Sequence, residues 1–546
     1  MRRFLHMLVA VSVIAAMAVV ALGSTASATA RYTPRWVKHV RHFGGMSGTV
    51  RASLKPGVIR AVGSSPAANR VSKRRSEGAV LVNVQANTDS EPPVPQNETA
   101  VAYSTDDPLT AVAASNDYVD GGLWIGTTHD GGNTWHSWFQ ASRMAQTGDF
   151  CSGGDPTVVY SSRDHAFYAA QLCFFRVHPE NAIEVIQSTD GGDHWTPGVR
   201  SSQVISNFNP DGSVDESLFY DKEQLAIDNF PASPHYGRLY VTYVPFHLLP
   251  DGSSDYCNAS ISYTDDVDAD NNGDIRDTTW THAAIQPPMP GDDGVSRSSN
   301  QGVQVAIDDT GGVNASFFQE DCNTSLDRRI LFRRSTDGGA TWGPLVQINR
   351  AGEWKDNPNK HDLLPNKNAR LPASTSAPIA WNDVTNKLEF VTQNNINKAT
   401  TGADISYTES ANHGTTWSHM RFVSVTGGGA PAPQDQYFPW LAVHPDSGDT
   451  HVIWYDNRND PGNVLIETYS VQTADTTDFT ANVNISTVAW NPNISFFGSG
   501  AFIGDYNGLA SAAGDVDYPV WADGRNTPAP ATGRPGQTDI FTVPNP

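Results

Sequence analysis

An eight-residue segment that ends in tryptophan recurs along this chain and limits the folds open to it. Four copies, which we call the aspartate turns, read THDGGNTW (residues 128–135), STDGGDHW (188–195), STDGGATW (335–342) and SANHGTTW (410–417), and a stretched copy spans 264–280. An apolar, strand-like run precedes each copy. The Asp side chain can accept backbone N–H groups, the glycines supply positive φ, and the tryptophan packs back on the sheet. The pattern predicts hairpin turns whose Asp residues are structural rather than catalytic.

A second repeat lies between these turns and marks the start of a structural unit. Each copy has a short polar start, an apolar strand, a turn and a second apolar strand. The starts fall at residues 97–103, 155–160, 221–227, 301–307, 377–381, 437–443 and 505–510. Seven starts several tens of residues apart predict an all-β, seven-bladed β-propeller. The 46 Gly and 35 Pro residues agree with a fold of strands and turns rather than helices.

The last unit has only three evident strands, at 505–510, 518–521 and 539–543. We expect residues 79–84 to supply the fourth, because an N-terminal strand would close the ring and remove exposed sheet edges. A six-bladed ring with an accessory strand unit is the alternative.

The aspartate turns and unit starts resemble those of Asp-box (bacterial neuraminidase repeat) β-propellers of the sialidase superfamily, over most of residues 79–543. The resemblance implies that each turn joins the third and fourth strands of a blade, on the face away from the ligand site. This resemblance predicts the fold specifically, but it says little about which reaction the protein catalyses.

The N-terminus predicts export. Arg2 and Arg3 precede an apolar run over residues 4–22, and Ala-x-Ala sequences follow it, so residues 1–30 are expected to be a secretory signal peptide; an uncleaved anchor is the alternative.

Residues 31–76 contain eleven Lys and Arg and no acid, and we expect a basic flexible segment; a pro-segment or a tether to an anionic cell wall are alternatives. Residues 77–546 are then the propeller, with 23 basic against 58 acidic residues, which argues against nucleic-acid binding.

The four cysteines of an exported chain are expected to form two disulfides. Cys151 and Cys173 belong to one unit, and Cys257 and Cys322 lie in corresponding loops of neighbouring units. We therefore predict the pairs Cys151–Cys173 and Cys257–Cys322.

In a propeller, the loops that enter the first strands converge on a central funnel. They bring candidate side chains from six units: Glu98, Asp155, Asp221 with Lys222 and Glu223, Gln301, Asp435 with Tyr437, and Asp505 with Tyr506. Two matched D-x-R elements follow second strands, Asp456 to Arg458 and Asp523 to Arg525. Each Asp can hold its Arg rigid and aim it into the funnel to bind a carboxylate. The alternative is a pair that only stiffens its loop.

The resemblance also implies catalytic roles. Sialidases bind the substrate carboxylate with three Arg, ionise a Tyr nucleophile through a Glu, and use an Asp as acid/base. Arg458 and Arg525 match two of the Arg positions, with Asp456, Asp523, Tyr437 and Asp505 as neighbours on the substrate side; the catalytic set would be Tyr506 (or Tyr437), Glu223 and Asp155. The chain departs from the family at its first unit, which lacks the Arg-Ile-Pro motif; the only similar tripeptide, RLP at 370–372, precedes the fifth start.

An acidic loop resembles part of a calcium site. Asp268, Asp270, Asn272 and Asp274 place oxygen donors at every second position, followed by an apolar residue, but Thr279 stands where an EF-hand loop has its bidentate Glu. A structural calcium ion is one interpretation, and an acidic turn is the other.

These observations favour a secreted, sialidase-like glycoside hydrolase that acts on glycans, including acidic sugars. A non-catalytic extracellular propeller that binds glycan or protein is the alternative, since propellers host both. We expect a monomer, extracellular or attached to the cell wall, that requires no cofactor, binds a glycan or glycoconjugate, and spans no membrane once the signal peptide is removed.

Overall fold

The computed structural model describes residues 32–43, 46–54, 70–71, 81–88, 95–118, 122–268, 272–290, 297–323, 327–356, 377–473, 478–495, 502–527 and 537–544. Residues 34–546 form one compact unit. Within the described ranges no helix has the length and apolar character needed to cross a membrane. The predicted signal peptide, residues 1–30, lies outside them.

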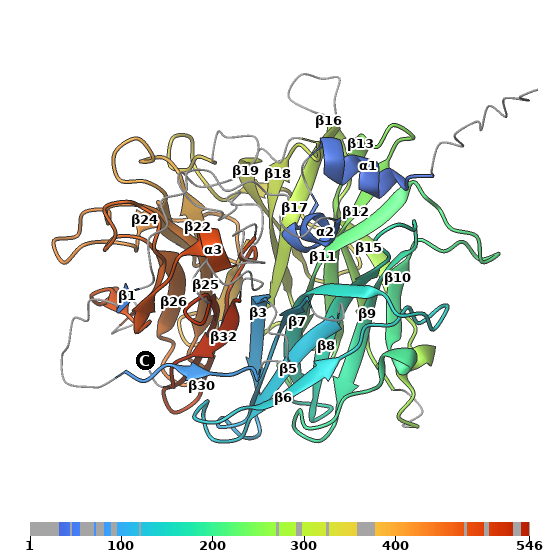
Figure 1. Ribbon diagram of the computed structural model, residues 1–546, viewed down its shortest axis with the longest axis horizontal. Helices are drawn as coiled ribbons and strands as arrows, with labels where there is room; N and C mark the ends of the chain where they lie inside the picture. Colours follow the sequence, from blue (N-terminus) through green and yellow to red (C-terminus); the bar gives the residue numbers. More distant parts are fainter. Residues whose placement is uncertain are drawn as a thin grey trace, which may run out of the picture. The chain divides into compact units, whose positions relative to one another are not determined.

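The strands of this unit form seven antiparallel blades (Figure 1). Blade 1 consists of β3 (Gln96–Tyr103), β4 (Ala111–Asp117), β5 (Gly122–Thr128) and β6 (His136–Gln140). Blade 2 consists of β7 (Ser152–Ser161), β8 (Ala166–Phe174), β9 (Asn181–Ser188) and β10 (Ser202–Ser206). Blade 3 consists of β11 (Leu218–Ile227), β12 (Leu239–Leu248), β14 (Ala259–Thr264) and β15 (Thr281–Gln286), with β13 (Ser254–Cys257) paired to β12.

The second half of the ring repeats this order. Blade 4 consists of β17 (Arg297–Ile307), β18 (Val313–Glu320), β19 (Asp327–Ser335) and β20 (Val346–Gln347), with β16 (Met289–Pro290) paired to the start of β17. Blade 5 consists of β21 (Ile379–Asn382), β22 (Lys387–Asn394), β23 (Asp404–Ser410) and β24 (Arg421–Phe422). Blade 6 consists of β25 (Gln436–Val443), β26 (Thr450–Asp456), β27 (Glu467–Gln472) and β28 (Val483–Asn484).

Blade 7 is closed by a strand from the other end of the chain. Its strands β30 (Gly508–Ala512), β31 (Val516–Asp523) and β32 (Asp539–Thr542) pair with β2 (Val84–Gln85), with Val84 opposite Thr542. The predicted closure by an N-terminal strand is confirmed, although the paired residues lie at the end of the expected segment 79–84 and one residue beyond it. Each first strand contacts the first strand of the next blade, and β30 contacts β3, so the ring is closed. The fold is the predicted seven-bladed β-propeller.

The aspartate turns adopt the expected geometry. They join the third and fourth strands of blades 1, 2, 4 and 5. In each copy the side chain at the third position accepts a backbone N–H four residues later: Thr134 to Asp130 at 2.8 Å, His194 to Asp190 at 2.9 Å, Thr341 to Asp337 at 2.8 Å and Thr416 to Asn412 at 2.9 Å. The glycine at the fifth position has positive φ in all four, from 79° to 98°. These residues are therefore structural, as predicted.

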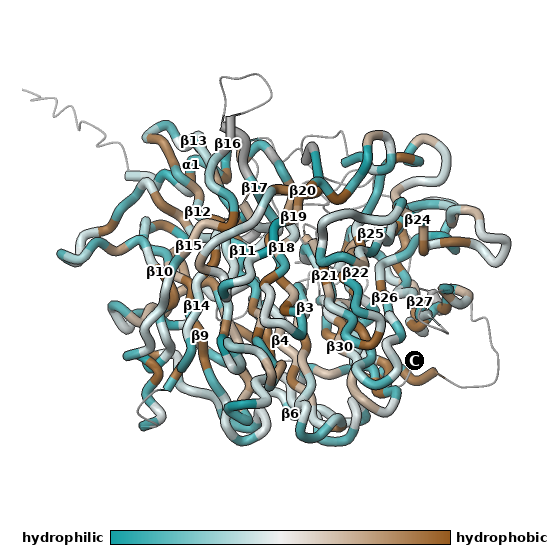
Figure 2. The backbone as a smooth tube through the Cα atoms, turned by 180° about the vertical axis from the view of Figure 1, so that it is seen from behind, coloured by the Kyte–Doolittle hydropathy of each residue, from teal (hydrophilic) through white to brown (hydrophobic). Residues whose placement is uncertain are grey.

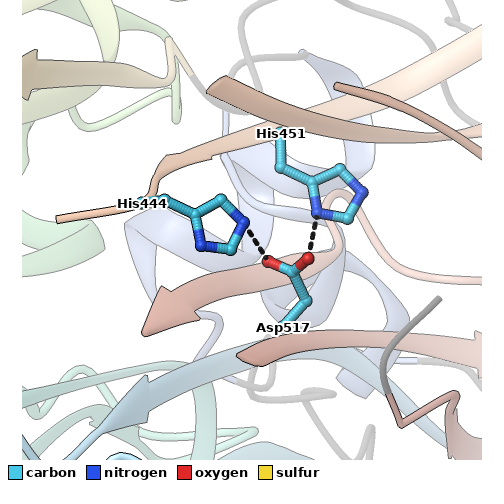
Figure 3. A group of neighbouring side chains, drawn as sticks. All are labelled: His444, His451 and Asp517. Carbon is cyan, nitrogen blue, oxygen red and sulfur yellow. Dashed lines mark ion pairs between the residues drawn. The ribbon is translucent and has the colours of Figure 1, made fainter. Parts of the chain in front are cut away.

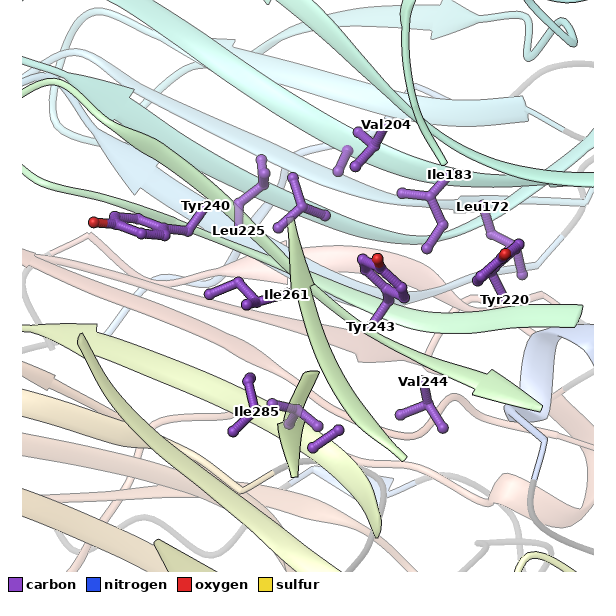
Figure 4. Close-up of a cluster of buried hydrophobic side chains, with 14 of the residues drawn as sticks. Leu172, Ile183, Val204, Tyr220, Leu225, Tyr240, Tyr243, Val244, Ile261 and Ile285 are labelled. Atoms are coloured by element: carbon purple, nitrogen blue, oxygen red, sulfur yellow. The ribbon is translucent and has the colours of Figure 1, made fainter. Parts of the chain in front are cut away.

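The hydrophobic core lies between the blades, where the faces of neighbouring sheets meet. Its largest cluster joins blades 2, 3 and 4 through aliphatic and tyrosine side chains such as Ile183, Tyr243 and Ile261 (Figure 4). Hydrophobic segments lie among the strands, while many of the connecting loops are hydrophilic (Figure 2). A buried strand face of this kind fixes the register of each sheet, because a shift by one residue would expose it.

The expectation of a flexible basic segment is wrong for residues 35–42 and 48–54, which form the helices α1 (Arg35–His42) and α2 (Gly48–Leu54). The physical reason is the apolar face of α1: Trp36 and Val37 are buried. Short β1 (Arg70–Val71) also pairs, with β29 (Val488–Ala489), and α3 (Pro492–Ser495) precedes blade 7. The 3₁₀ turns η1 (Gly198–Arg200) and η2 (Ile275–Asp277) complete the elements.

Candidate functional site

A repeated backbone irregularity lies at the start of five of the seven first strands. The pairing of first and second strands shifts register in blades 1, 2, 3, 4 and 6. At the shift lie residues with positive φ: Glu98 (59°), Asp155 (51°), Lys222 (58°), Gly302 (64°) and Phe438 (55°). A β-bulge bends a strand and re-aims its side chains. Non-glycine residues in this conformation store strain that is typical of functional sites.

Five buried carboxyl groups meet where these strands begin, and we call them the acid cluster: Glu98, Asp155, Asp221, Glu223 and Asp505. Each interacts electrostatically with at least one other member. Lys222 lies among them, with its Nζ 3.3 Å from Asp505 Oδ2. The side chain of Tyr506 belongs to the same site, and its hydroxyl donates to Pro156 O at 3.1 Å. The predicted convergence of entering loops is thus confirmed for these residues.

Burial sets the protonation of the acid cluster. It raises the pKa of Glu98 and of Glu223 well above the usual value, and the Asp155 carboxylate raises both further. Burial also raises the pKa of Asp221 to about 7, with a smaller opposing effect from Lys222. Neither side-chain oxygen of Glu223 has a hydrogen-bond partner elsewhere in the described chain, and a hydrogen bond from its own backbone N–H partly opposes the shift. Several of these groups therefore hold protons near neutral pH.

The N-terminal helix α2 fills the mouth of this site. Ser47 N–H donates to Asp221 Oδ2 at 2.6 Å, and Gly48 N–H donates to Asp505 Oδ2 at 2.8 Å. The Thr49 hydroxyl donates to Glu98 Oε2 at 2.5 Å. Backbone N–H groups at a helix N-terminus attract anions, which explains the fit between this end of α2 and carboxylates. Figure 1 shows α2 above β11, at one end of the blades. We call residues 46–54 the plug.

Helix α1 anchors the plug to blades 2 and 3. The Trp36 ring lies 5.6 Å from Phe174 and 5.4 Å from Phe219, and its Nε1 donates to His178 O at 2.8 Å. Arg35 and two further side chains of α1 bond backbone carbonyls at the end of β12 and in the loop that follows it. With the plug in place, the cavity beside Asp155, Lys222 and Tyr506 is only about 10 Å³, which is room for about one water molecule.

Sequence reasoning missed Ser47, Gly48 and Thr49. Their segment is basic and rich in small residues, and no local signal shows that its helix would end against carboxylates. The mixed polar and apolar pattern of residues 35–42 was the one clue that this part of the chain packs on something.

The predicted arginine clamp does not form, and the first correction concerns Arg458. Its guanidinium donates to Asp456 Oδ2 at 2.8 Å, Val425 O at 3.0 Å and Asn482 Oδ1 at 3.0 Å. It also lies 4.2 Å from the centre of the Tyr469 ring. Tyr469 is in the third strand of blade 6 and Asn482 precedes the fourth, so Arg458 points along the blade to its outer half.

Arg525 repeats this arrangement in blade 7. Its guanidinium pairs with Asp523 at 2.6 Å, donates to Thr487 Oγ1 at 3.0 Å and to Asn83 Oδ1 at 2.9 Å, and lies 4.0 Å from the centre of the Phe541 ring. The Asp two residues earlier holds each Arg sideways instead of inward. The D-x-R pairs stiffen loops between neighbouring blades, which is the alternative that the sequence left open.

The two candidate tyrosines are separated by the structure. Tyr437 is fully buried against Phe438 and Tyr455 in an apolar cluster that spans blades 6 and 7, and the carboxylates that act on it are Asp435 and Asp456 rather than the acid cluster. Tyr506 does lie in the acid cluster, but burial, and then Glu98 and Asp155, raise the pKa of its hydroxyl well above the usual value. A neutral phenol is not a nucleophile, so the expected sialidase-type role of Tyr506 does not fit this environment.

In the acidic loop at residues 268–274, the described Asp side chains make hydrogen bonds and an ion pair to groups close by in the chain. Asp268 accepts the N–H groups of Asn272 and Gly273, and Asp274 accepts from Arg276 as an ion pair. Asp270 lies outside the described residues. An Arg on one of the four oxygen donors favours the acidic-turn interpretation, and a calcium ion there stays a prediction that a chelator can test.

Both disulfides are present as predicted. Cys151 pairs with Cys173 within blade 2, and Cys257 pairs with Cys322 between blades 3 and 4.

A second hollow lies at the outer edge of blades 1 and 2. It has a volume of about 420 Å³, and aromatic side chains dominate its lining. Trp138, Phe139 and Phe150 are 43%, 45% and 62% exposed. Large apolar side chains exposed together mark binding surfaces more often than chance placement does.

No protein-family model matches the sequence, and no curated protein matches it. Solved structures with a similar fold include the Hadza microbial sialidase Hz136 (12% identity, TM-score 0.42, 68% of this chain and 65% of that chain). A Trypanosoma rangeli sialidase in complex with the inhibitor DANA matches at 14% identity and TM-score 0.40, over 75% of this chain and 56% of that chain. An α-L-arabinofuranosidase from Fusarium graminearum matches at 11% identity and TM-score 0.41, over 87% and 97%. The chain thus spans less than two thirds of either sialidase, and similarity at this level concerns the fold alone.

Proposed function

We propose that this protein is a latent glycoside hydrolase whose acid cluster is the catalytic centre and whose plug keeps that centre closed. The observation that carries the proposal is the state of Glu223: it is fully buried, its side-chain oxygens have no hydrogen-bond partner among the other described residues, and its pKa is raised. A buried carboxyl group that holds its proton at neutral pH is suited to act as a general acid.

Glycoside hydrolysis of the common kind needs two carboxyl groups, one protonated and one ionised. Glu223 is the proton donor to the glycosidic oxygen. Asp155, whose backbone N–H is held by Asn116 Oδ1 at 2.9 Å, supplies the second carboxylate, as nucleophile or as base for water. The neutral hydroxyl of Tyr506 orients the sugar by hydrogen bonding.

The charge of the site favours an uncharged sugar. Lys222 is the one cation among the described residues of the cluster, and it is already paired with Asp505. A sialic acid carboxylate would meet the ionised members of the acid cluster without the arginine clamp that the sequence suggested. A neutral glycoside meets no such repulsion.

The experiment opens the site before it measures activity. Trp36→Ala removes the aromatic anchor of α1, and Thr49→Glu places a carboxylate against Glu98. We expect both variants to release methylumbelliferone from glycosides of neutral sugars at least about tenfold faster than the wild type. Adding Glu223→Gln to either variant should lower the rate by about 10²- to 10⁴-fold.

Arg41→Ala is the matched control, because Arg41 lies on the exposed side of α1. It should leave the plug, and therefore the low activity, unchanged. Opened variants that remain folded by circular dichroism but cleave neither neutral glycosides nor a sialoside would refute the proposal.

The aromatic hollow at blades 1 and 2 favours a second candidate, non-catalytic glycan binding. Exposed Trp138 and Phe139 offer flat apolar faces, and Gln140 and Arg143 in the same lining offer hydrogen bonds. Sugars present one apolar face and a rim of hydroxyls, which suits this combination. Glycan affinity that is lost in Trp138→Ala but unaffected by displacing the plug would support this second function.

A further inference from the structure

Two histidines and an aspartate meet at the junction of the last two blades (Figure 3). His444 follows β25 directly and His451 lies in β26, both in blade 6. Asp517 lies in β31 of blade 7. All three side chains are buried, with 3%, 2% and 5% of each residue exposed. The three atoms they offer lie within 4.8 Å of one another.

The hydrogen bonds around His444 fix which ring nitrogen faces the aspartate. Nδ1 lies 3.2 Å from Ala512 O, and a carbonyl only accepts, so Nδ1 carries the proton. In a neutral ring Nε2 is then a bare lone pair, and it lies 3.2 Å from Asp517 Oδ1. A lone pair facing a carboxylate is repulsive unless a positive charge lies between them.

His451 meets the same carboxylate from the other side. Its buried Nδ1 is 3.0 Å from Asp517 Oδ2, so both imidazoles face one carboxylate. In this contact Nδ1 does not have the direction of an N–H hydrogen bond. A cation bound between the three groups would give this nitrogen a partner in the right direction.

The surroundings match those of metal ligands. A ligating histidine usually donates its other N–H to a backbone carbonyl, as His444 does to Ala512. A ligating carboxylate is usually held by a hydrogen bond of its own, and Ser511 Oγ donates to Asp517 Oδ1 at 2.5 Å.

We propose that His444 Nε2, His451 Nδ1 and Asp517 bind a divalent first-row cation such as Zn²⁺, with water as the fourth ligand. Two imidazoles and a carboxylate are ligands that Zn²⁺ prefers. Tetrahedral ligands about 2.0–2.1 Å from zinc lie roughly 3.3 Å apart, close to the two His–Asp distances here. The site needs only small side-chain movements to admit the ion.

The ion would cross-link the two blades next to the ring closure. The same junction already has a hydrogen bond from Gly514 N–H of blade 7 to Asp446 Oδ2, beyond β25, at 2.8 Å. Because blade 7 also carries the N-terminal strand β2, a metal link there would hold the closing blade to the ring. The role is structural, and it does not depend on the proposed hydrolase activity.

Zinc binding to the wild-type protein tests the proposal. Tag-free protein is stripped with EDTA, dialysed against Zn²⁺ and analysed for metal; we expect about one ion per chain, and a rise of the melting temperature that EDTA reverses. Co²⁺ in place of Zn²⁺ should give the visible absorption of a four- or five-coordinate ion. His451→Gln and Asp517→Asn should each weaken binding by more than about tenfold.

Two controls separate this site from others. His413→Gln removes one histidine that lies beside a single carboxylate, Asp308, and should keep full zinc binding. Glu98→Gln alters the acid cluster and should also keep it. Wild-type protein that binds no zinc, or zinc binding that His451→Gln leaves intact, would overturn the proposal even if Asp517→Asn fails to fold.

Discussion

At the scale of single residues, burial decides the chemistry more than residue type does. Glu223 and Glu184 are both fully buried glutamates, and burial raises the pKa of each; that of Glu184 reaches about 7. Asp337 lies at the surface, and hydrogen bonds from Thr341 lower its pKa to about 2. In the sequence these are simply three acidic residues. Their surroundings decide whether each holds a proton or, as an ionised carboxylate, accepts hydrogen bonds in a turn.

The raised pKa of Glu184 predicts a pH-dependent stability. A carboxyl group with a folded pKa above its unfolded value of about 4.3 stabilises the fold at low pH, and this contribution is lost as pH rises toward 7. Glu184→Gln keeps a side chain that can accept from Ala145 N–H and donate to Ser201 Oγ, where the carboxylate accepts from both. We expect the variant to match the wild type near pH 4 and to exceed its free energy of unfolding by about 3 kcal/mol at pH 8.

Urea denaturation at the two pH values measures this difference. Glu409→Gln, at a half-buried site, is the control and should show no such gain. Parallel pH profiles for wild type and Glu184→Gln would contradict the prediction.

At the scale of elements, the same local devices are repeated around the ring. The aspartate turns join the third and fourth strands of four blades with one hydrogen-bond pattern. Bulges with positive φ interrupt the pairing of five first strands. The turns could be predicted because all their interactions are local. The bulges could not, because each depends on where the second strand pairs.

The third turn provides a test with an internal comparison. Asp337→Ala removes the acceptor for Thr341 N–H and for Ser335 Oγ, and should lower the free energy of unfolding by about 1–2 kcal/mol at pH 7. Asp337→Asn should cost less, because Asn412 fills the same position in the fourth turn and accepts from Thr416 N–H.

The pKa of Asp337 gives the prediction a pH signature. A lowered folded pKa contributes stability above the unfolded value of about 3.9 and loses it as pH falls toward 2. The difference between wild type and Asp337→Ala should therefore shrink as pH falls from 4 to 2 in thermal unfolding. A difference that does not shrink over this range would mean that the turn is held by contacts other than the ionised carboxylate.

At the scale of the whole molecule, long-range links hold the ring together. The strand β2 joins the two ends of the chain in blade 7, and the Cys257–Cys322 disulfide joins blades 3 and 4 across 65 residues. The Cys151–Cys173 disulfide spans 22 residues within one blade. A longer closed loop removes more freedom from the unfolded chain.

Replacing each disulfide by two serines should destabilise the protein more for the disulfide that closes the longer loop. Loss of Cys257–Cys322 should lower the free energy of unfolding by about 4 kcal/mol and loss of Cys151–Cys173 by about 3 kcal/mol. Equilibrium denaturation of the two double variants measures both. If the loss of Cys151–Cys173 costs more, strain or local packing outweighs chain entropy.

The sequence alone determined the seven blades, the closure of the ring by an N-terminal strand, the aspartate turns and both disulfides. These features rest on local hydrogen bonding, on periodic patterns and on a count of four cysteines. It also placed Asp155, Glu223 and Tyr506 together, because equivalent loops of a ring converge on its axis.

Only the tertiary structure decided what stands around those residues. Arg458 and Arg525 turn outward because partners from distant segments, Asn482 and Asn83, lie there to receive them. The plug reaches the acid cluster from residues 46–54, and His444 meets Asp517 from another blade. Such contacts join positions far apart in the chain, and their energies depend on distances that no local pattern of residues encodes.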